Sequence, residues 1–165
     1  MIFNMYERED FLSWDEYFMA LAEVCALRSK DPNTRVGACL VDENKKVISL
    51  GYNGMPIGCE DKKMPWGKDE KEYLKTKYPF VCHAELNAIL NSKGKIFKTA
   101  ILYTTLFPCN ECAKAIIQSG ITKIIYKENK YKNKDSFIAA KQMFDLTGIE
   151  YIKYNLKQKE IKIEI

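Results

Sequence analysis

Apolar residues recur at helical spacing in the first part of the chain. Ser13 and Glu16 are placed as a capping box, in which each side chain bonds the backbone N–H of the other residue at a helix start. The apolar positions that follow, three or four residues apart, are Phe18, Leu21, Ala22 and Cys25. Asp31–Pro32 ends this pattern, because proline does not continue a helix. The spacing therefore predicts a helix that begins at Ser13 and stops before Asp31.

Two short apolar runs rich in β-branched residues follow the predicted helix. They cover 36–41 and 46–51, and the polar residues between them are typical of a hairpin turn. The regular pattern then stops over 52–80, a segment that contains Trp66 and a charged run at 68–72. A loop of this length in a compact domain is usually functional or disordered, and Trp66 favours an ordered one.

Helical and strand patterns alternate in the second half of the chain. The expected elements are a helix that begins at His83, a strand at 100–106, a helix at 112–119, a strand at 121–126, a helix at 136–146 and a strand at 149–154. Strand–helix–strand repeats form parallel strands with right-handed crossovers. We therefore expect one domain over residues 1–165, an α/β protein with a three-layer α/β/α fold. Its mixed five-stranded sheet carries the antiparallel hairpin at one side, and its core covers about residues 13–154.

The last residues, 155–165, form a tail. Ile161, Ile163 and Ile165 alternate there with charged residues, a pattern typical of an edge strand. The pattern leaves three arrangements open: pairing with this sheet, pairing with another subunit, or a mobile tail.

Composition supports a single domain with an apolar core. The chain has 165 residues, 47% of them hydrophobic, and a formal net charge of +4. No apolar run reaches the length of a membrane span, and Met1–Asp10 lacks the basic-then-apolar pattern of a signal peptide. No disulfide framework is evident among the remaining cysteines, which are Cys25, Cys39, Cys59 and Cys82. Cysteines of this kind suit a reducing compartment. We expect a cytoplasmic protein with no membrane partner. Its charge suits anionic nucleotides and is too small to indicate a nucleic-acid partner.

The only histidine, His83, and the pair Cys109 and Cys112 form a candidate metal site. A catalytic zinc takes three nitrogen, sulfur or oxygen ligands from the protein and leaves a fourth position for water. Cysteines at a helix start lie near free backbone N–H groups, where the helix dipole favours the thiolate that binds metal. Glu85 lies within one turn of His83, close enough to reach a water on the metal without being a ligand. Cys109 also follows a predicted strand, and ligands of α/β sheets bind outside the carboxyl ends of strands.

Less specific interpretations of these residues remain open. A lone Cys-x-x-Cys in an intracellular protein can be a redox pair, and a lone histidine is often a polar residue with a satisfied hydrogen bond. A structural zinc would need four ligands, and Cys82 beside His83 is a candidate for the fourth. Neighbouring residues at a helix start point in different directions, so we favour the catalytic zinc.

The order His-x-Glu followed by Pro-Cys-x-x-Cys is also a known signature of zinc nucleobase deaminases, in which the Glu is an acid–base group. The segments that extend this likeness are Ser29–Asn33, Val36–Ala38, Gly51–Pro56, His83–Ala88 and Pro108–Lys114. In this order, from about Asp15 to Tyr154, the chain resembles the deoxycytidylate deaminase family of the zinc-dependent cytidine deaminase superfamily. The resemblance implies a cytidine deaminase-like fold.

The resemblance also implies a reaction, the hydrolytic deamination of dCMP at C4 to dUMP and ammonia, which supplies dUMP for dTTP synthesis. Zinc would lower the pKa of a water molecule toward about 7. Glu85 would be the catalytic residue that carries protons from this water to ring N3 and to the leaving amino group. Some relatives hold an extra structural zinc through additional histidines, which this chain lacks. We therefore expect one Zn²⁺ per subunit.

Asn53 and Tyr131 resemble substrate contacts of the family. The Asn53 amide would bond the 3′-hydroxyl of the sugar, although an asparagine at this place can instead hold its own turn. The lysines near Tyr131, which could meet the phosphate or be solvated surface, are Lys127, Lys130, Lys132 and Lys134.

Members of the family are commonly activated by dCTP and inhibited by dTTP. The residues that resemble the effector site are Gly51, Tyr52, Asn53, Gly54 and Pro56. Glycines would let backbone N–H groups approach a triphosphate, which Mg²⁺ would accompany, and the alternative is an ordinary glycine-rich turn. Such regulation implies an oligomer, and the resemblance favours a homohexamer.

Two other functions remain open. A deaminase that acts on cytosine or adenosine in nucleic acid shares the zinc and the glutamate, but needs an open groove with aromatic and basic residues. The long loop after Gly54 instead favours closure over a mononucleotide. A non-catalytic zinc-binding assembly module would have no use for Glu85.

Overall fold

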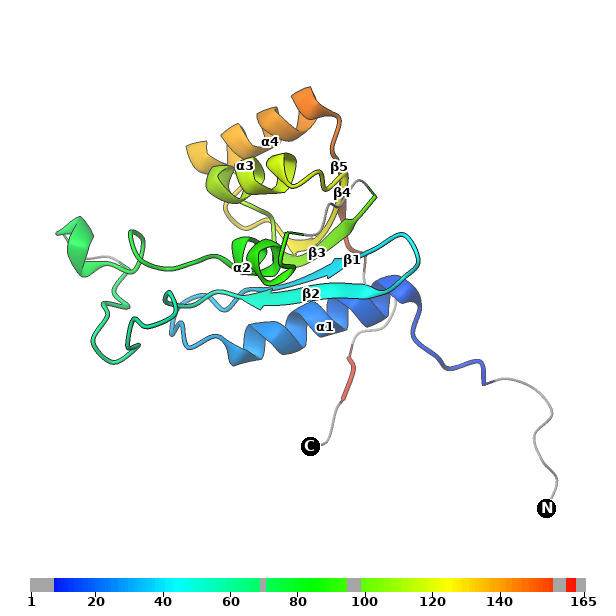
Figure 1. Cartoon of the computed structure of the whole chain (residues 1–165), viewed down its shortest axis with the longest axis horizontal. Helices are drawn as coiled ribbons and strands as arrows, with labels where there is room; N and C mark the ends of the chain where they lie inside the picture. Colours follow the sequence, from blue (N-terminus) through cyan, green and yellow to red (C-terminus); the bar gives the residue numbers. More distant parts are fainter. Residues whose placement is uncertain (1–7, 69–70, 95–98, 156–159, 163–165) are drawn as a thin grey trace, which may run out of the picture.

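A five-stranded sheet lies between helices on both of its faces (Figure 1). The computed structural model describes residues 8–68, 71–94, 99–155 and 160–162. The helices are α1 (Trp14–Arg28), η1 (a 3-10 helix, Tyr73–Lys75), α2 (Ala84–Asn91), α3 (Asn110–Gln118) and α4 (Asp135–Thr147). The strands are β1 (Gly37–Val41), β2 (Val47–Tyr52), β3 (Ile101–Leu106), β4 (Lys123–Glu128) and β5 (Glu150–Lys153). No helix in the described ranges is long and apolar enough to cross a membrane.

The strands are arranged in the order β2-β1-β3-β4-β5. β1 runs antiparallel to both of its neighbours, β2 and β3, whereas β3, β4 and β5 run parallel. The connection between parallel strands passes through a helix in each case, as strand–helix–strand patterning requires. The expected α/β/α layers and the mixed sheet with a hairpin at one side are therefore confirmed.

Alternation along the strands divides the apolar core between the two faces of the sheet. On one face, Cys39, Tyr103 and Ile125 pack with Phe18 and Ala22 of α1. On the other face, strand residues pack with α2, α3 and α4, and these strand residues are Ala38, Leu40, Leu102 and Ile124. The face covered by three helices is the one that carries the candidate site.

The predicted capping box begins α1. The Glu16 N–H donates to Ser13 Oγ at 3.4 Å, and the Ser13 N–H donates to Glu16 Oε2 at 2.7 Å. At the other end of the helix, the Ser29 hydroxyl donates to the carbonyl oxygen of Asn53 at 2.8 Å. The end of α1 is therefore bonded directly to the residue that follows β2.

Helix α3 begins at Asn110, two residues before the start that its apolar pattern predicts. Its first turn contains the polar Asn110 and Glu111, which carry no apolar signal. Cys109 takes the N-cap position in extended backbone, and Cys112 lies in the first turn. The early start places both sulfur atoms at the N-terminal end of the helix.

The segment between β2 and α2 is ordered with little regular structure. The Trp66 indole N–H donates to the Asp61 carbonyl oxygen at 3.0 Å. At the base of the loop, Gly54 and Cys82 exchange two backbone hydrogen bonds of 3.0 and 2.8 Å. The prediction of an ordered loop is confirmed for its described part, and residues 69–70 of the charged run lie outside it.

The C-terminal tail is described in part. After β5, residues 160–162 lie outside any strand. Ile163 and Ile165, which carry most of the predicted edge-strand pattern, fall outside the described residues.

Candidate active site

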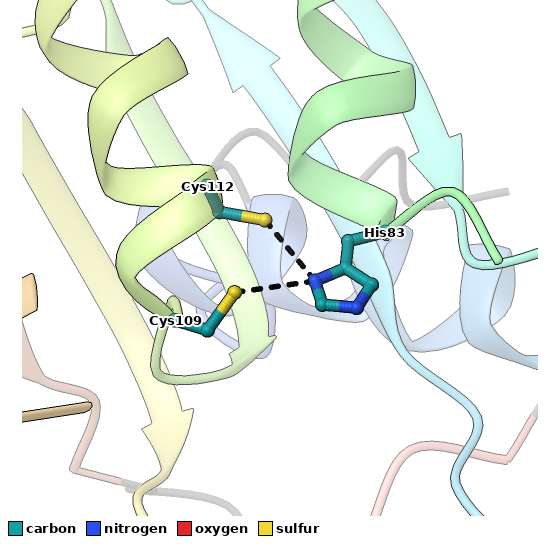
Figure 2. A group of neighbouring side chains, drawn as sticks. All are labelled: His83, Cys109 and Cys112. Atoms are coloured by element: carbon teal, nitrogen blue, oxygen red, sulfur yellow. Dashed lines mark hydrogen bonds between the residues drawn. The ribbon is translucent and has the colours of Figure 1, made fainter. Parts of the chain in front are cut away.

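His83, Cys109 and Cys112 lie at the beginnings of two neighbouring helices, with their side chains pointing toward one another (Figure 2). His83 is the N-cap residue of α2, and Cys109 is the N-cap residue of α3. His83 Nδ1 lies 3.4 Å from each of the two sulfur atoms. The structure therefore brings together the three ligands that the sequence predicts.

The donor atoms of this cluster fit a catalytic zinc. The nitrogen and the two sulfurs lie within 4.8 Å of one another. Among the described residues, no other histidine, cysteine or carboxylate places a ligand atom close to all three of these atoms. The backbone of Cys82 pairs with Gly54. One imidazole and two cysteine sulfurs are zinc ligands, and three protein ligands leave one tetrahedral position open. The arrangement differs from the closed four-ligand set of a structural site.

The three groups influence one another electrostatically. Hydrogen bonds from Cys112 and His83 lower the pKa of the Cys109 thiol to about 4. The pKa of Cys112 rises because its proton is held in the bond to Cys109 and because the group is buried. The pKa of His83 rises chiefly through its hydrogen bond with Cys109. A metal ion that binds here must displace the protons that remain in the cluster.

Glu85 lies beside the cluster, in the first turn of α2, and is 4% exposed. Thr104 Oγ1 lies 3.1 Å from Glu85 Oε1, and Cys112 Sγ lies 3.5 Å from Oε2. Burial raises the pKa of the Glu85 carboxyl, and the charge of His83 opposes this shift. A carboxyl whose pKa is raised toward the working pH is suited to both take up and release a proton.

A cavity of about 420 Å³ opens onto the cluster and is lined by His83, Glu85 and Cys109. The segment between β2 and α2 contributes further lining residues, which are Asn53, Lys68, Tyr73, Lys77, Tyr78 and Val81. Cavities that hold one small molecule usually measure about 300–1,000 Å³. The volume therefore suits a ligand the size of a single nucleotide.

Asn53 lines this cavity, and its side chain also holds the local chain together. Its Oδ1 accepts from the Val36 N–H at 2.7 Å. Its amide group donates to Asp31 Oδ2 at 3.2 Å and to the Thr34 carbonyl oxygen at 3.0 Å. Both amide protons are therefore used, as in the alternative in which the asparagine holds its own turn. A ligand could still use the second lone pair of Oδ1.

Asp31 and Lys77 form a buried ion pair in the wall of the cavity. The Asp31 side chain is 1% exposed and that of Lys77 is 7% exposed. From the sequence, Asp31 is expected as the end of a helix and as part of the family-like segment Ser29–Asn33, and Lys77 has no predicted role. A charged residue within an irregular loop gives no signal that it is buried, because its partner is 46 residues away.

Tyr131 also lines the cavity, together with Lys134. The Lys134 and Lys130 ammonium groups lie 4.8 and 5.3 Å from the centre of the Tyr131 ring. A hydrogen bond with Thr34 and these lysines lower the pKa of the Tyr131 hydroxyl. Lys127, in contrast, is paired with Glu23 at 2.7 Å and is not among the residues that line this cavity. Of these two lysines, the structure thus places Lys134 at the cavity and Lys127 outside its lining.

Comparison with known proteins assigns the chain to a family. The family described as "Cytidine and deoxycytidylate deaminase zinc-binding region" matches residues 12–128. The chain belongs to this deaminase family. Among its relatives, the deoxycytidylate deaminase of Pongo abelii is 50% identical over 158 residues, which cover 96% of this chain and 89% of that protein. The deoxycytidylate deaminase of Mus musculus is 48% identical with the same coverage.

A solved structure supports the fold of this deaminase. The dCMP deaminase from the cyanophage S-TIM5, in complex with dCMP and dUMP, matches it with a TM-score of 0.65 and 29% identity. The match covers 90% of this chain and all of the phage chain. The predicted cytidine deaminase-like fold, the family resemblance and the expectation of a hydrolytic deaminase are confirmed.

Two glycines of the predicted effector segment have structural roles in this deaminase. A Cβ atom on Gly51 would lie 2.2 Å from the carbonyl oxygen of Ala84, so glycine lets α2 approach β2 closely. The Gly54 N–H is already bonded to Cys82. In this conformation the Gly54 N–H closes the base of the loop. Tyr52 and Pro56 are exposed, and the effector role of the segment stays a prediction.

Proposed function

We propose that this protein converts dCMP and water to dUMP and ammonia. The observation that carries the proposal is the buried Glu85 carboxyl beside the His83, Cys109 and Cys112 cluster. The proposal is supported by the 50% identity between this chain and a deoxycytidylate deaminase over most of the length of each protein. The reaction would take place within the single domain of a cytoplasmic enzyme.

His83, Cys109 and Cys112 would hold one zinc ion per subunit. When bound, zinc supplies a Lewis acid that lowers the pKa of a water molecule toward about 7. Glu85 Oε2 lies on the Cys112 side of the carboxylate and would accept the proton from the attacking water. Glu85 would pass this proton to ring N3 and later help to protonate the departing amino group. Burial raises the pKa of the Glu85 carboxyl, which favours the protonated form that the second half of this cycle uses.

Asn53 and Tyr131 would position the nucleotide. The remaining lone pair of Asn53 Oδ1 can accept a hydrogen bond from the 3′-hydroxyl, since both amide protons are already used. Tyr131 and Lys134 line the cavity, and a positive charge beside the tyrosine suits the 5′-phosphate.

The regulatory part of the proposal is that dCTP activates and dTTP inhibits a homohexamer. The effector, with Mg²⁺ on its triphosphate, would bind near the exposed segment Gly51–Pro56. The hydrogen bonds between Gly54 and Cys82 support a connection to the site, because Cys82 directly precedes His83. A ligand that favours one arrangement of this segment would thereby bias the position of a metal ligand.

Ammonia release from dCMP by zinc-loaded protein tests the proposed reaction. Turnover should rise with dCTP and fall with dTTP, and a cytosine-containing single-stranded oligonucleotide should not react. Glu85→Gln should lower the rate by about 10²- to 10⁴-fold or more while one zinc per chain is retained. Glu60→Gln is the control, since Glu60 is exposed and should leave the rate unchanged.

Two outcomes would contradict the proposal. Turnover of the oligonucleotide without turnover of dCMP would assign the site to nucleic acid. Zinc binding without turnover of either substrate would indicate a non-catalytic assembly module.

A further inference from the structure

Thr104 is a buried polar residue in the centre of the sheet. It lies in the central strand, β3, and is 0% exposed. Valine has nearly the same shape without the hydroxyl, and a buried hydroxyl is costly unless it is hydrogen bonded. Here the hydroxyl lies 3.1 Å from Glu85 Oε1 and 3.0 Å from the Leu106 carbonyl oxygen. The Thr104 hydroxyl therefore has two hydrogen-bond acceptors nearby, whereas a valine here would make only apolar contacts.

The Glu85 carboxylate has few hydrogen-bond partners. In the described part of the chain, two side chains lie within hydrogen-bond distance of it, Thr104 at Oε1 and Cys112 at Oε2, and the backbone N–H of Glu85 also bonds it. Cys112 belongs to the candidate metal cluster, so Thr104 is the described side chain outside that cluster that lies within hydrogen-bond distance of the carboxylate.

Thr104 is held more firmly than the residue it contacts. It pairs with Ala38 of β1 on one side and with Tyr126 of β4 on the other. A β-branched side chain is also restricted in χ1. Glu85 has a longer and more flexible side chain that projects from the first turn of α2. The central strand is therefore a rigid reference for the orientation of the carboxylate.

We infer that Thr104 is a positioning residue whose hydroxyl orients the Glu85 carboxylate, with Oε1 bound to the sheet and Oε2 facing the metal-binding cluster. The inference rests on the proposed function, in which Glu85 moves the protons. A misplacement of about 1 Å in a reacting group can cost on the order of 10²-fold in rate. Loss of the hydroxyl should therefore lower kcat and leave KM nearly unchanged.

A purely structural role for the hydroxyl predicts a different result. If the Thr104 proton served only the Leu106 carbonyl oxygen, its loss would lower stability and leave kcat unchanged. Thr105 offers a matched control in the same strand. Its hydroxyl accepts a hydrogen bond from the Gly37 N–H at 3.1 Å, and its side chain points to the opposite face of the sheet.

Three variants separate the two roles. Thr104→Val keeps the shape and removes the hydroxyl, Thr104→Ser keeps the hydroxyl, and Thr105→Val removes a hydroxyl that does not contact Glu85. In Thr104→Val we expect kcat for dCMP to fall about tenfold to a hundredfold and KM to change by less than about twofold. Serine should restore most of kcat, and Thr105→Val should match the wild type. An unchanged kcat in Thr104→Val, or an equal loss in all three variants, would overturn the inference.

A second measurement does not depend on turnover. Crystal structures of the zinc-loaded wild type and Thr104 variants would compare the orientation of the Glu85 carboxylate directly. It should be kept in Thr104→Ser and turned in Thr104→Val. An unchanged carboxylate in Thr104→Val would overturn the inference, whereas a wild type that leaves dCMP untouched would count against the proposed function alone.

Discussion

The sulfur of Cys109 lies in the lining of the cavity, and its pKa is lowered. Its two hydrogen-bond partners, Cys112 and His83, stabilise the thiolate and lower its pKa to about 4. In metal-free protein this sulfur is therefore negatively charged over the whole physiological range of pH. Such a thiolate is both a nucleophile and a ready metal ligand.

This charge predicts selective alkylation. Metal-free protein treated with iodoacetamide at pH 6 should be modified rapidly at Cys109, and the fast phase should disappear as the pH falls through about 4 and the thiolate takes up a proton. Mass spectrometry of peptides identifies the modified residue. Cys59→Ser removes an exposed thiol and should keep the fast phase, whereas Cys109→Ser should lose it. Saturating zinc should protect Cys109, and rapid modification of the zinc-loaded protein would contradict the assigned ligands.

Single residues were predictable where their chemistry depends on spacing along the chain. His83, Glu85, Cys109 and Cys112 belong to two short motifs, so their types and separations already indicate a metal site. Thr104 was not predicted, because its contact with Glu85 depends on how α2 packs against β3. A polar residue within an otherwise apolar strand was the available signal.

At the scale of elements, the approach of α2 to β2 depends on a missing side chain. Gly51→Ala should lower the free energy of unfolding by about 1–3 kcal/mol. The new Cβ atom would overlap backbone atoms of α2, which cannot rotate away as a side chain can. Urea unfolding followed by circular dichroism measures the change. Gly54→Ala is the matched control, since a Cβ there would lie 3.6 Å from the nearest atom of Tyr52, an ordinary contact. Equal stability of Gly51→Ala and wild type would show that α2 can move outward freely.

The long loop is fixed to the rest of the domain by the buried pair of Asp31 and Lys77. Lys77→Met would leave Asp31 buried without its partner and should cost about 3–5 kcal/mol of unfolding free energy. Lys75→Met breaks an exposed pair with Glu72 and should cost at most about 1 kcal/mol. Thermal and urea unfolding of both variants compare the two costs. Similar values would mean that the loop is not held through this ion pair.

Elements were predictable where a face of the helix or strand is apolar. The hairpin and the alternating second half follow from periodicity, and the structure confirms both. The first turn of α3 escaped prediction because it is polar. The loop before α2 was predicted to be ordered, but its contacts were not, because they are individual hydrogen bonds. Such bonds join residues far apart in the sequence and leave no periodic trace.

For the molecule as a whole, the candidate metal site joins two helices of the same layer. A zinc ion that binds only the folded chain should stabilise it by about 4 kcal/mol when free zinc exceeds the dissociation constant a thousandfold. Removal of zinc with a chelator should therefore lower Tm by several degrees, and added zinc should restore it. Cys109→Ser should abolish the dependence of Tm on zinc. If the chelator left the Tm of the zinc-loaded wild type unchanged, this would contradict a metal ion bound by both α2 and α3.

The layered architecture of the whole molecule was predictable because strands and helices alternate in the second half. The location of the cavity was predictable, but its lining only in part: Asn53 and Tyr131 were named as substrate contacts, whereas Asp31 and Lys77 were not. Its walls combine residues from the segment after α1, the long loop and the segment after β4, and sequence periodicity does not report which loops meet.

The division of the candidate metal ligands between the starts of α2 and α3 has a consequence for a cleaved chain. His83 and Cys109 are 26 residues apart, and the segment between them contains β3, the central strand. If one peptide bond in that segment were cleaved, an ion bound by both residues would still hold the two fragments together. A disulfide holds the fragments of a nicked protein in the same way. Separation of the two fragments would then require chelation as well as proteolysis.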